Sequence, residues 1–231
     1  EGYLHADCYN AYTLLGKQED ITHVACMAHA RRYFFDITRQ TKKKKGLAFQ
    51  VVELIGKLYH LEKRLKEEKA TPEHIKHMRQ QGAVPILSKI KILLDGNVAK
   101  VPPQGPLAKA MHYMLTHWKA LNYYLDDGRL EIDNNRSERS IKPFVIGRKN
   151  WMFHGNARGA RAGATLFSLV ETCKAHHIDV FSWFKHALNN IHQADTADKL
   201  EQLLPFNVKQ DVLEAARAIP ELIFPDKKVD E

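Results

Sequence analysis

Cysteine is scarce in this chain of 231 residues, and its three cysteines form no C-x-x-C pair. An odd number of thiols without such a pair argues against a disulfide framework and against a four-cysteine zinc site. Long apolar runs are also lacking, since no stretch approaches the roughly 20 residues of a membrane-spanning helix. The first residues have neither the basic start nor the apolar block of a secretory signal. We therefore expect a cytoplasmic protein with no membrane partner.

Positive charge is in excess, with 35 lysines and arginines against 27 acidic residues and a net charge of +8. Clusters of basic side chains supply phosphate affinity without base specificity, so they favour a nucleic-acid partner. A solvated basic surface is the alternative, and it is the better interpretation of the lysine run 42–45 taken alone. The clusters lie at residues 31–32, 42–45, 136–142, 148–149 and 158–161.

Hydrophobic periodicity predicts a mostly helical chain with two short strands, near residues 2–7 and 21–26. Helical spacing begins at Ala28, and Thr71-Pro72 has the residue types of a helix start. Proline and glycine should interrupt the helical pattern. We expect breaks at Gly82, Pro85 and Pro143, a helix over 107–125 closed by Gly128, and a strand or extended connection over 147–156. Further helices are predicted at 159–175, after a cap at Asp179, from Asp195, and weakly over 212–219.

Two carboxylates are candidate metal ligands: Asp7, after the first predicted strand, and Glu138, in a short predicted helix. Divalent cations that serve phosphoryl transfer prefer carboxylate oxygens. Each residue also has a structural interpretation. Acidic residues are common at strand ends, and Glu138 lies three residues after Asn135, as in a capping box. Glu131 and Asp133 are competitors for a metal role. The local pattern leaves capping and catalysis open for Glu138.

Cys26 and His29 form a C-x-x-H pair, which is only half of a zinc site. Residue types and spacing therefore establish a basic, mostly helical protein with candidate acidic ligands and go no further.

Four stretches of the sequence resemble transposases of the insertion sequence 66 family. The longest reads "GRLEIDNNRSERSIKPFVIGRKNWMFHGNARGARAGATLFSLVETCKAHHID". The others are "GYLHADCYNAY", "ACMAHARRYFFDI" followed by "ELIGKLYHLE", and "LLPFN". They occur in the family's order and cover most of residues 1–207, which is far more specific than one short motif.

This resemblance implies a DDE transposase, in which two aspartates and one glutamate bind two Mg²⁺ ions. The ions serve nicking at the transposon ends and strand transfer into target DNA. The second aspartate falls on Asp7, and the glutamate falls on Glu138, a few residues after Asn134-Asn135. Cys26 and His29 match a pair that precedes a helical insertion in such families.

The resemblance also implies the fold and the division of the chain. We expect an α+β, mostly helical protein with a partial RNase H-like catalytic core over residues 1–166, interrupted by a helical insertion at about 40–105. A small helical C-terminal region should follow over 167–207, and then a tail over 208–231. Arg139, Arg148 and Lys149 are expected to contact DNA phosphates, and a homo-oligomer acting on paired DNA ends is expected.

One departure from the family's pattern concerns the first aspartate, which is expected well upstream of Asp7. Residues 1–231 would then be a fragment, a truncated gene product or half of a split transposase, and we expect no catalysis by this segment alone. A non-catalytic DNA-binding remnant is the alternative function. A structural helical protein, with Glu138 only as a cap, is the third.

Overall fold

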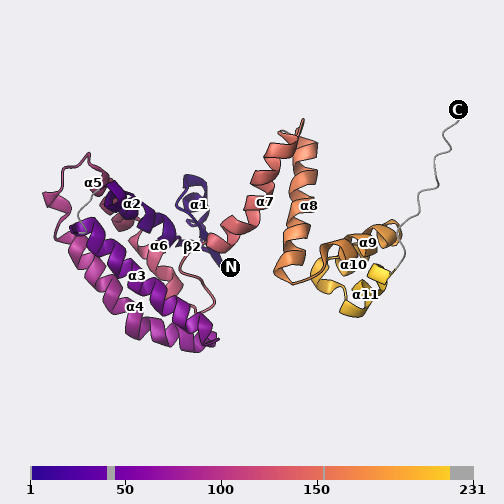
Figure 1. Ribbon diagram of the computed structural model, residues 1–231, viewed down its shortest axis with the longest axis horizontal. Coiled ribbons are helices and arrows are strands. Elements are labelled where there is room, and N and C mark those ends of the chain that lie inside the picture. Colours follow the sequence, from indigo (N-terminus) through magenta and orange to yellow (C-terminus); the bar gives the residue numbers. More distant parts are fainter. Residues whose placement is uncertain (1, 41–44, 153, 219–231) are drawn as a thin grey trace. The chain divides into compact units, whose positions relative to one another are not determined.

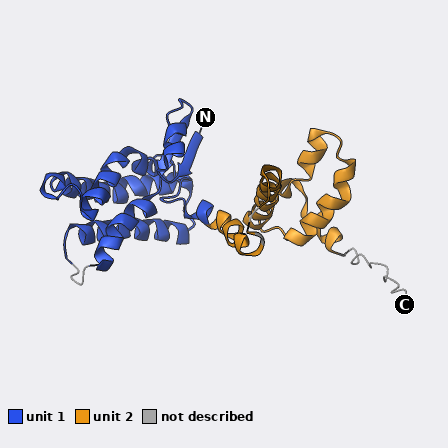
Figure 2. Ribbon diagram, turned by 90° about the horizontal axis from the view of Figure 1, so that it is seen from above, with its two compact units in different colours: residues 1–138 blue, residues 139–231 orange. Residues whose placement is uncertain are grey.

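The structure is a computed structural model, and it describes residues 2–40, 45–152 and 154–218. The chain divides into two compact units, residues 1–138 and 139–231 (Figure 2). The described residues are mostly helical and include a two-stranded sheet. This confirms the predicted α+β, mostly helical class, whereas the RNase H-like core stays a prediction. No helix in the described part of the chain has the length and apolar character needed to cross a membrane.

The sheet of the first unit consists of β1 (Gly2–Ala6) and β2 (Ile21–Ala25), which pair in parallel with Ala6 opposite Ala25. Parallel strands need a crossover of about a dozen residues. Residues 7–20 provide it and include the short helix α1 (Asn10–Leu15). Both strands were predicted from the sequence and are confirmed. Burial increases along each strand toward its carboxyl end, so this end of the sheet lies at the core.

Long helices make up most of the rest of the first unit. They are α2 (Met27–Gln40), α3 (Leu47–Glu67), α4 (Pro72–Asp95) and α5 (Pro106–Thr116). α3 packs along α4, while α2 packs against α3 and α5 (Figure 1). Shorter elements follow, namely η1 (Val98–Lys100), α6 (Trp118–Asn122) and η2 (Tyr123–Leu125). The core draws on β2 and on all four long helices, and its fully buried members include Val24, Phe34, Ile55, Ile90 and Met114.

Two predictions about helix boundaries in this unit are wrong. α4 continues through Gly82 and Pro85, although an interior proline costs about 3 kcal/mol. Packing on α3 offsets this cost, and a Cβ at Gly82 would lie 3.1 Å from Leu61 Cδ2, so glycine permits the close approach. The predicted helix over 107–125 divides at His117 into α5, α6 and η2. The predicted start of α4 is confirmed, because Thr71 Oγ1 accepts a hydrogen bond from His74 N–H.

A buried arginine on α4 joins three parts of the first unit. Arg79 is 2% exposed, and its guanidinium donates two hydrogen bonds to the Glu62 carboxylate of α3, at 2.8 and 2.7 Å. The remaining N–H groups donate to the backbone carbonyls of Tyr124, Asp127 and Leu130, at 2.6, 3.0 and 2.8 Å. All five donors of the guanidinium are therefore satisfied. This arrangement fixes the segment that leads from η2 to residues 131–135.

In the second unit, the first helix is longer than predicted. α7 (Asn135–Trp151) begins in the first unit and continues through Pro143, so the predicted stop at Pro143 and the predicted extended segment over 147–156 are wrong up to Trp151. Packing against α8 (Ala157–Ala175) offsets the proline's cost. The Phe144 ring lies edge-on to Phe167, with centroids 5.2 Å apart, and stacks on His154 at 5.4 Å.

The remaining helices are α9 (Val180–Asn190), η3 (Ile191–Gln193), α10 (Ala197–Gln202), η4 (Pro205–Asn207) and α11 (Gln210–Ala218). Cys173, Trp183 and Leu213 form their small core. The predicted cap is confirmed, since Asp179 Oδ1 accepts a hydrogen bond from Ser182 N–H at 2.8 Å. The weak helical pattern over 212–219 corresponds to α11, and residues 219–231 of the predicted tail lie outside the described residues.

Replacing Arg79 with leucine should destabilise the first unit by about 3–5 kcal/mol, because Glu62 and three backbone carbonyls would lose their donors in a buried site. Urea unfolding followed by circular dichroism measures this change. Arg64→Leu is the matched control, because Arg64 is exposed and should contribute less than about 1 kcal/mol. Equal stabilities of the two variants would contradict the structural role of Arg79.

Candidate carboxylate site

Glu138 lies in the first turn of α7, and its carboxylate faces a histidine of α2. Glu138 Oε1 is 3.4 Å from His29 Nε2, a contact that becomes an ion pair when the imidazole is protonated. The Glu138 side chain is 41% exposed, so a ligand can approach it from solvent. Among the described residues, His29 Nδ1 is buried and has no hydrogen-bond partner. The imidazole is therefore held with one nitrogen toward the carboxylate and the other in the interior.

The geometry at the start of α7 differs from the capping box that was one of the two interpretations of Glu138. Asn135 is the first residue of the helix, and its N–H donates to Asp133 Oδ1 at 3.1 Å. The Glu138 N–H donates to the Asn134 carbonyl at 3.1 Å, an ordinary helical hydrogen bond. Asp133, rather than Glu138, thus accepts the hydrogen bond of the first N–H of the helix. The Glu138 carboxylate is left facing His29 and solvent.

Asp133 is a buried carboxylate, 8% exposed, that connects α7 to α3. Its Oδ2 accepts a hydrogen bond of 2.8 Å from the Tyr59 hydroxyl. Burial raises the pKa of Tyr59 far above its ordinary value, and the Asp133 carboxylate raises it further. Tyr59 therefore remains a neutral donor. Both oxygens of Asp133 accept hydrogen bonds within the fold, so this carboxylate has a structural role at the start of α7.

Cys26 and His29 are close in the sequence but have different surroundings. The Cys26 thiol is fully buried, and burial raises its pKa, while the backbone N–H groups of Asn134, His29 and Ala28 donate to its sulfur and oppose that rise. The nearby Met27 N–H donates to the Ile132 carbonyl at 3.1 Å. Cys26 thus holds the Asn134 backbone against the start of α2, and His29 contacts Glu138.

Asp7 lies directly after β1, where two hydrogen bonds fix the chain. Its Oδ1 accepts from the Tyr9 N–H at 3.1 Å, and its backbone carbonyl is 3.0 Å from Nε2 of the buried His23 on β2. The Asp7 side chain remains partly exposed. A half-exposed carboxylate at the carboxyl end of a parallel strand is in the position where such sheets bind ligands.

The structure brings Glu138, His29, Asn134, Asn135 and Cys26 together where α2 and α7 begin. Of these side chains, the Glu138 carboxylate and the two asparagine amides carry oxygen atoms, the ligands that Mg²⁺ prefers. Within residues 2–40, 45–152 and 154–218, however, no three histidine, cysteine, aspartate or glutamate side chains are grouped so that they could hold a metal ion. The described residues therefore do not form a complete metal site. Shared ligation by Asp7 and Glu138 stays a prediction.

The predicted DNA contacts Arg139, Arg148 and Lys149 are all exposed on α7. They belong to a stretch, residues 139–170, that contains six basic side chains and no aspartate or glutamate. Local charge therefore favours an anionic partner along this part of the chain. Contact with DNA stays a prediction.

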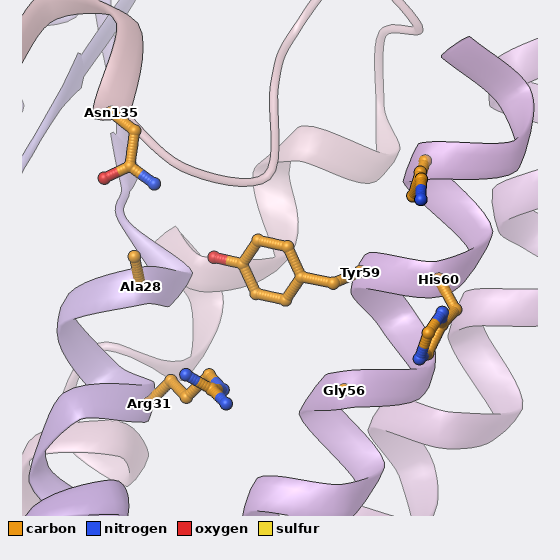
Figure 3. Close-up of a pocket in the computed structure, with 7 residues that line it drawn as sticks. Ala28, Arg31, Gly56, Tyr59, His60 and Asn135 are labelled. Carbon is orange, nitrogen blue, oxygen red and sulfur yellow. The ribbon is translucent and has the colours of Figure 1, made fainter. Parts of the chain in front are cut away.

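Three features of this region were not predicted from the sequence: the buried role of Asp133, its hydrogen bond to Tyr59, and a cavity of about 510 Å³ between α2 and α3. The only signal in the sequence was that Tyr59 lies in the stretch "ELIGKLYHLE". Figure 3 shows the Tyr59 ring reaching from α3 toward α2 and Asn135. The cavity is lined by Ala28, Arg31, Gly56, Tyr59, His60, Lys63 and Asn135.

Comparison with protein families identifies the class of protein to which this site belongs. Residues 1–162 match the family described as Transposase IS66 family, and residues 168–206 match the IS66 C-terminal element. These matches define a transposase chain. Because the first match covers well over half of the residues, the chain belongs to the IS66 family of transposases.

Curated relatives of the chain occur in Sinorhizobium fredii. The uncharacterized protein y4jD is 35% identical over 217 residues, which are 91% of this chain and 42% of y4jD. The uncharacterized proteins y4qI and y4hP are 34% and 29% identical and are covered over 40% of their lengths. The chain therefore spans about two fifths of the length of the curated relatives it matches. No solved structure matches the chain.

Replacing Tyr59 with phenylalanine should cost about 1–3 kcal/mol, because a buried oxygen of Asp133 would lose its donor. Urea unfolding measures the cost, and faster amide hydrogen exchange at Asn135 would show that the start of α7 has loosened. Tyr12→Phe, at an exposed tyrosine of α1, is the control and should change neither quantity. Unchanged exchange at Asn135 in Tyr59→Phe would contradict the proposed connection between α3 and α7.

The first unit should also lose stability as the pH falls. Burial lowers the pKa of His5 on β1, and nearby Asp133 and Glu131 only partly oppose this. The unfolded chain therefore binds more protons than the folded chain below the ordinary histidine pKa of about 6.5. Stability is fully present above that pH and falls as the pH decreases toward the lowered pKa of His5.

Urea unfolding at several pH values tests this expectation. His5→Gln should flatten the dependence below about pH 6.5, because the half-buried imidazole is removed. His74→Gln, at an exposed histidine of α4, should leave the dependence as in the unchanged chain. Identical pH dependence in His5→Gln and the unchanged chain would show that His5 does not cause the effect.

Proposed function

We propose that the protein carrying this segment catalyses Mg²⁺-dependent nicking and strand transfer at the ends of an insertion sequence. In this proposal Asp7 and Glu138 are two of its metal-binding carboxylates. The observation that carries it is the exposure of the Glu138 carboxylate and its contact with His29. Its carboxylate is partly exposed and faces His29, while Asp133 serves the helix start. A carboxylate that is exposed and accepts none of the hydrogen bonds of the helix start can take a ligand from solvent.

Each residue of the site has a specific task in this proposal. Mg²⁺, when bound, would activate the attacking oxygen and stabilise the leaving oxygen of the phosphodiester. Asp7 and Glu138 would hold the ion, and His29 would orient the Glu138 carboxylate through the 3.4 Å contact. A third carboxylate would come from a segment outside residues 1–231. That part of the proposal rests on the family resemblance.

DNA is the proposed partner, and the basic stretch 139–170 is the proposed contact. Arg139, Arg148 and Lys149 are exposed and would bind backbone phosphates, which position DNA without reading its sequence. A multimer that holds two DNA ends is part of the same proposal and rests on the resemblance.

A second candidate function is a DNA-binding remnant without catalysis. It is favoured by one observation: the described residues contain no group of three metal-binding side chains. The basic stretch 139–170 would serve this function unchanged. The two candidates therefore differ in DNA cleavage and agree in DNA binding.

The test measures Mg²⁺-dependent nicking of duplex DNA that carries the element's own ends, by the full-length gene product. Asp7→Asn and Glu138→Gln should each lower the nicking rate at least about 100-fold, because several kcal/mol of transition-state stabilisation would be lost. DNA binding measured without divalent cation should be unchanged.

Glu131→Gln is the matched control, because Glu131 lies near the site and should leave nicking intact. Loss of nicking in Glu131→Gln, with retention in Glu138→Gln, would sink the assignment of Glu138. DNA binding without nicking by the full-length protein would establish the remnant instead. The same assay on residues 1–231 alone tests whether this segment cleaves DNA by itself.

A further inference from the structure

We propose that the cavity between α2 and α3 binds a backbone phosphate of the DNA strand that reaches the carboxylate site. Arg31, His60 and Lys63 would be its ligands. This inference rests on the proposed function, since it takes DNA as the partner. It concerns residues outside the basic stretch 139–170. It adds a phosphate-binding site built on α2 and α3.

The charged side chains that line the cavity are all basic. Its polar side chains include Arg31 from α2 and His60 and Lys63 from α3, and none of its lining residues is acidic. A volume of about 510 Å³ is sufficient for a phosphate group with its adjoining sugar. Figure 3 shows Arg31 extending from α2 toward the α3 segment that holds Gly56 and His60. Cationic donors from two helices therefore converge on one space.

These cations are not committed to carboxylates of the fold. Arg31 is half-buried, with its guanidinium over the Phe35 ring at 5.0 Å, and it forms no ion pair within the described part of the chain. Lys63 has one acidic neighbour, Glu67, at 3.6 Å, and both side chains are largely exposed. Such a surface pair is weak, so a phosphate can displace it. An arginine held by an aromatic ring and lacking a carboxylate suits bidentate binding of phosphate.

Gly56 gives the ligand its space. A Cβ at Gly56 would have no heavy atom within 4 Å, so the helix packing does not require glycine at this position. Glycine in a helix interior costs about 1 kcal/mol relative to alanine. Gly56 lies on the face of α3 that lines the cavity. The absence of a side chain therefore keeps the cavity open.

The cavity adjoins the carboxylate site through two elements. Ala28 in its lining directly precedes His29, which contacts Glu138. Asn135 in its lining is three residues before Glu138, and residues at this spacing share a face of a helix. A phosphate held in the cavity would therefore place the next part of the strand near Glu138. The occupant that these positions favour is a DNA phosphodiester.

The experiment measures binding of a short fluorescein-labelled DNA duplex by anisotropy at several salt concentrations, without divalent cation. Each phosphate contact contributes about 0.9 to the slope of log affinity against log salt. Arg31→Gln and Lys63→Gln should each reduce this slope by about 0.9. Lys89→Gln, an equal charge change at an exposed position of α4 away from the cavity, should leave the slope unchanged.

Gly56→Leu is a variant that changes no charge and should not disturb folding, because leucine favours helices and meets open space. It should lower the slope by at least as much as Lys63→Gln, since its side chain would project into the cavity beside Arg31 and Lys63. If Gly56→Leu and Lys63→Gln bound DNA with the same salt slope as the unchanged protein, the proposal would be overturned. Equal slope losses in Lys63→Gln and Lys89→Gln would overturn it too, because the effect would then be one of net charge.

Inorganic phosphate, titrated by calorimetry, distinguishes the two sources of this ligand chemistry. Phosphate binding that Gly56→Leu abolishes, with no change in the DNA slope, would assign the cavity to a free phosphate and overturn the DNA assignment. Glu138→Gln should leave the slope intact, because the carboxylate is not a ligand of the cavity. If nicking fails while Arg31→Gln and Lys63→Gln still reduce the salt slope of DNA binding, only the proposed catalysis is contradicted. If nicking occurs while these variants leave the salt slope unchanged, only this inference is contradicted.

Discussion

The buried guanidinium of Arg79 is the interaction on which the first unit depends. Its five hydrogen bonds end on Glu62 of α3 and on three backbone carbonyls of residues 124–130. A loop has many unsatisfied carbonyls, and a buried arginine has five donors at fixed angles, so each satisfies the other. Because the following residues lead into α7, the orientation of this loop determines where the Glu138 helix begins.

The helices α3 and α4 are consequently a support for the candidate carboxylate site. α3 contributes Glu62 to the Arg79 network and Tyr59 to Asp133, and α4 contributes Arg79 itself. Asp133 then accepts the first N–H of α7, and Cys26 accepts the Asn134 N–H from the side of α2. Contacts from α3 and from the residue before α2 thus act on the consecutive residues Asp133 and Asn134, directly before α7. Such redundancy is what holds a functional side chain in one geometry.

Local patterns determined the elements that depend on a few neighbouring residues. The strands at residues 2–6 and 21–25, the Thr71 cap and the Asp179 cap all follow from residue types within one turn or one strand, and they are confirmed. The helices through Pro85 and Pro143 were mispredicted for the opposite reason. Proline's local cost is fixed, whereas the packing that offsets it comes from residues distant in the sequence. α3 packs along α4, with Leu61 close to Gly82, and Phe167 of α8 packs against Phe144 of α7.

The sequence by itself determined the family, the charge of the chain and the candidate carboxylates, because ordered motifs and composition are properties of the linear chain. Only the tertiary structure distinguishes the surroundings of Asp133, in the "LEIDNN" stretch, from those of Glu138, which follows that stretch. Asp133 and Glu138 look alike in sequence, but one is 8% exposed with both oxygens hydrogen-bonded and the other is 41% exposed beside His29. The physical reason is that the role of a carboxylate depends on its solvation and its partners. Those partners, Tyr59 and His29, lie far from it along the chain.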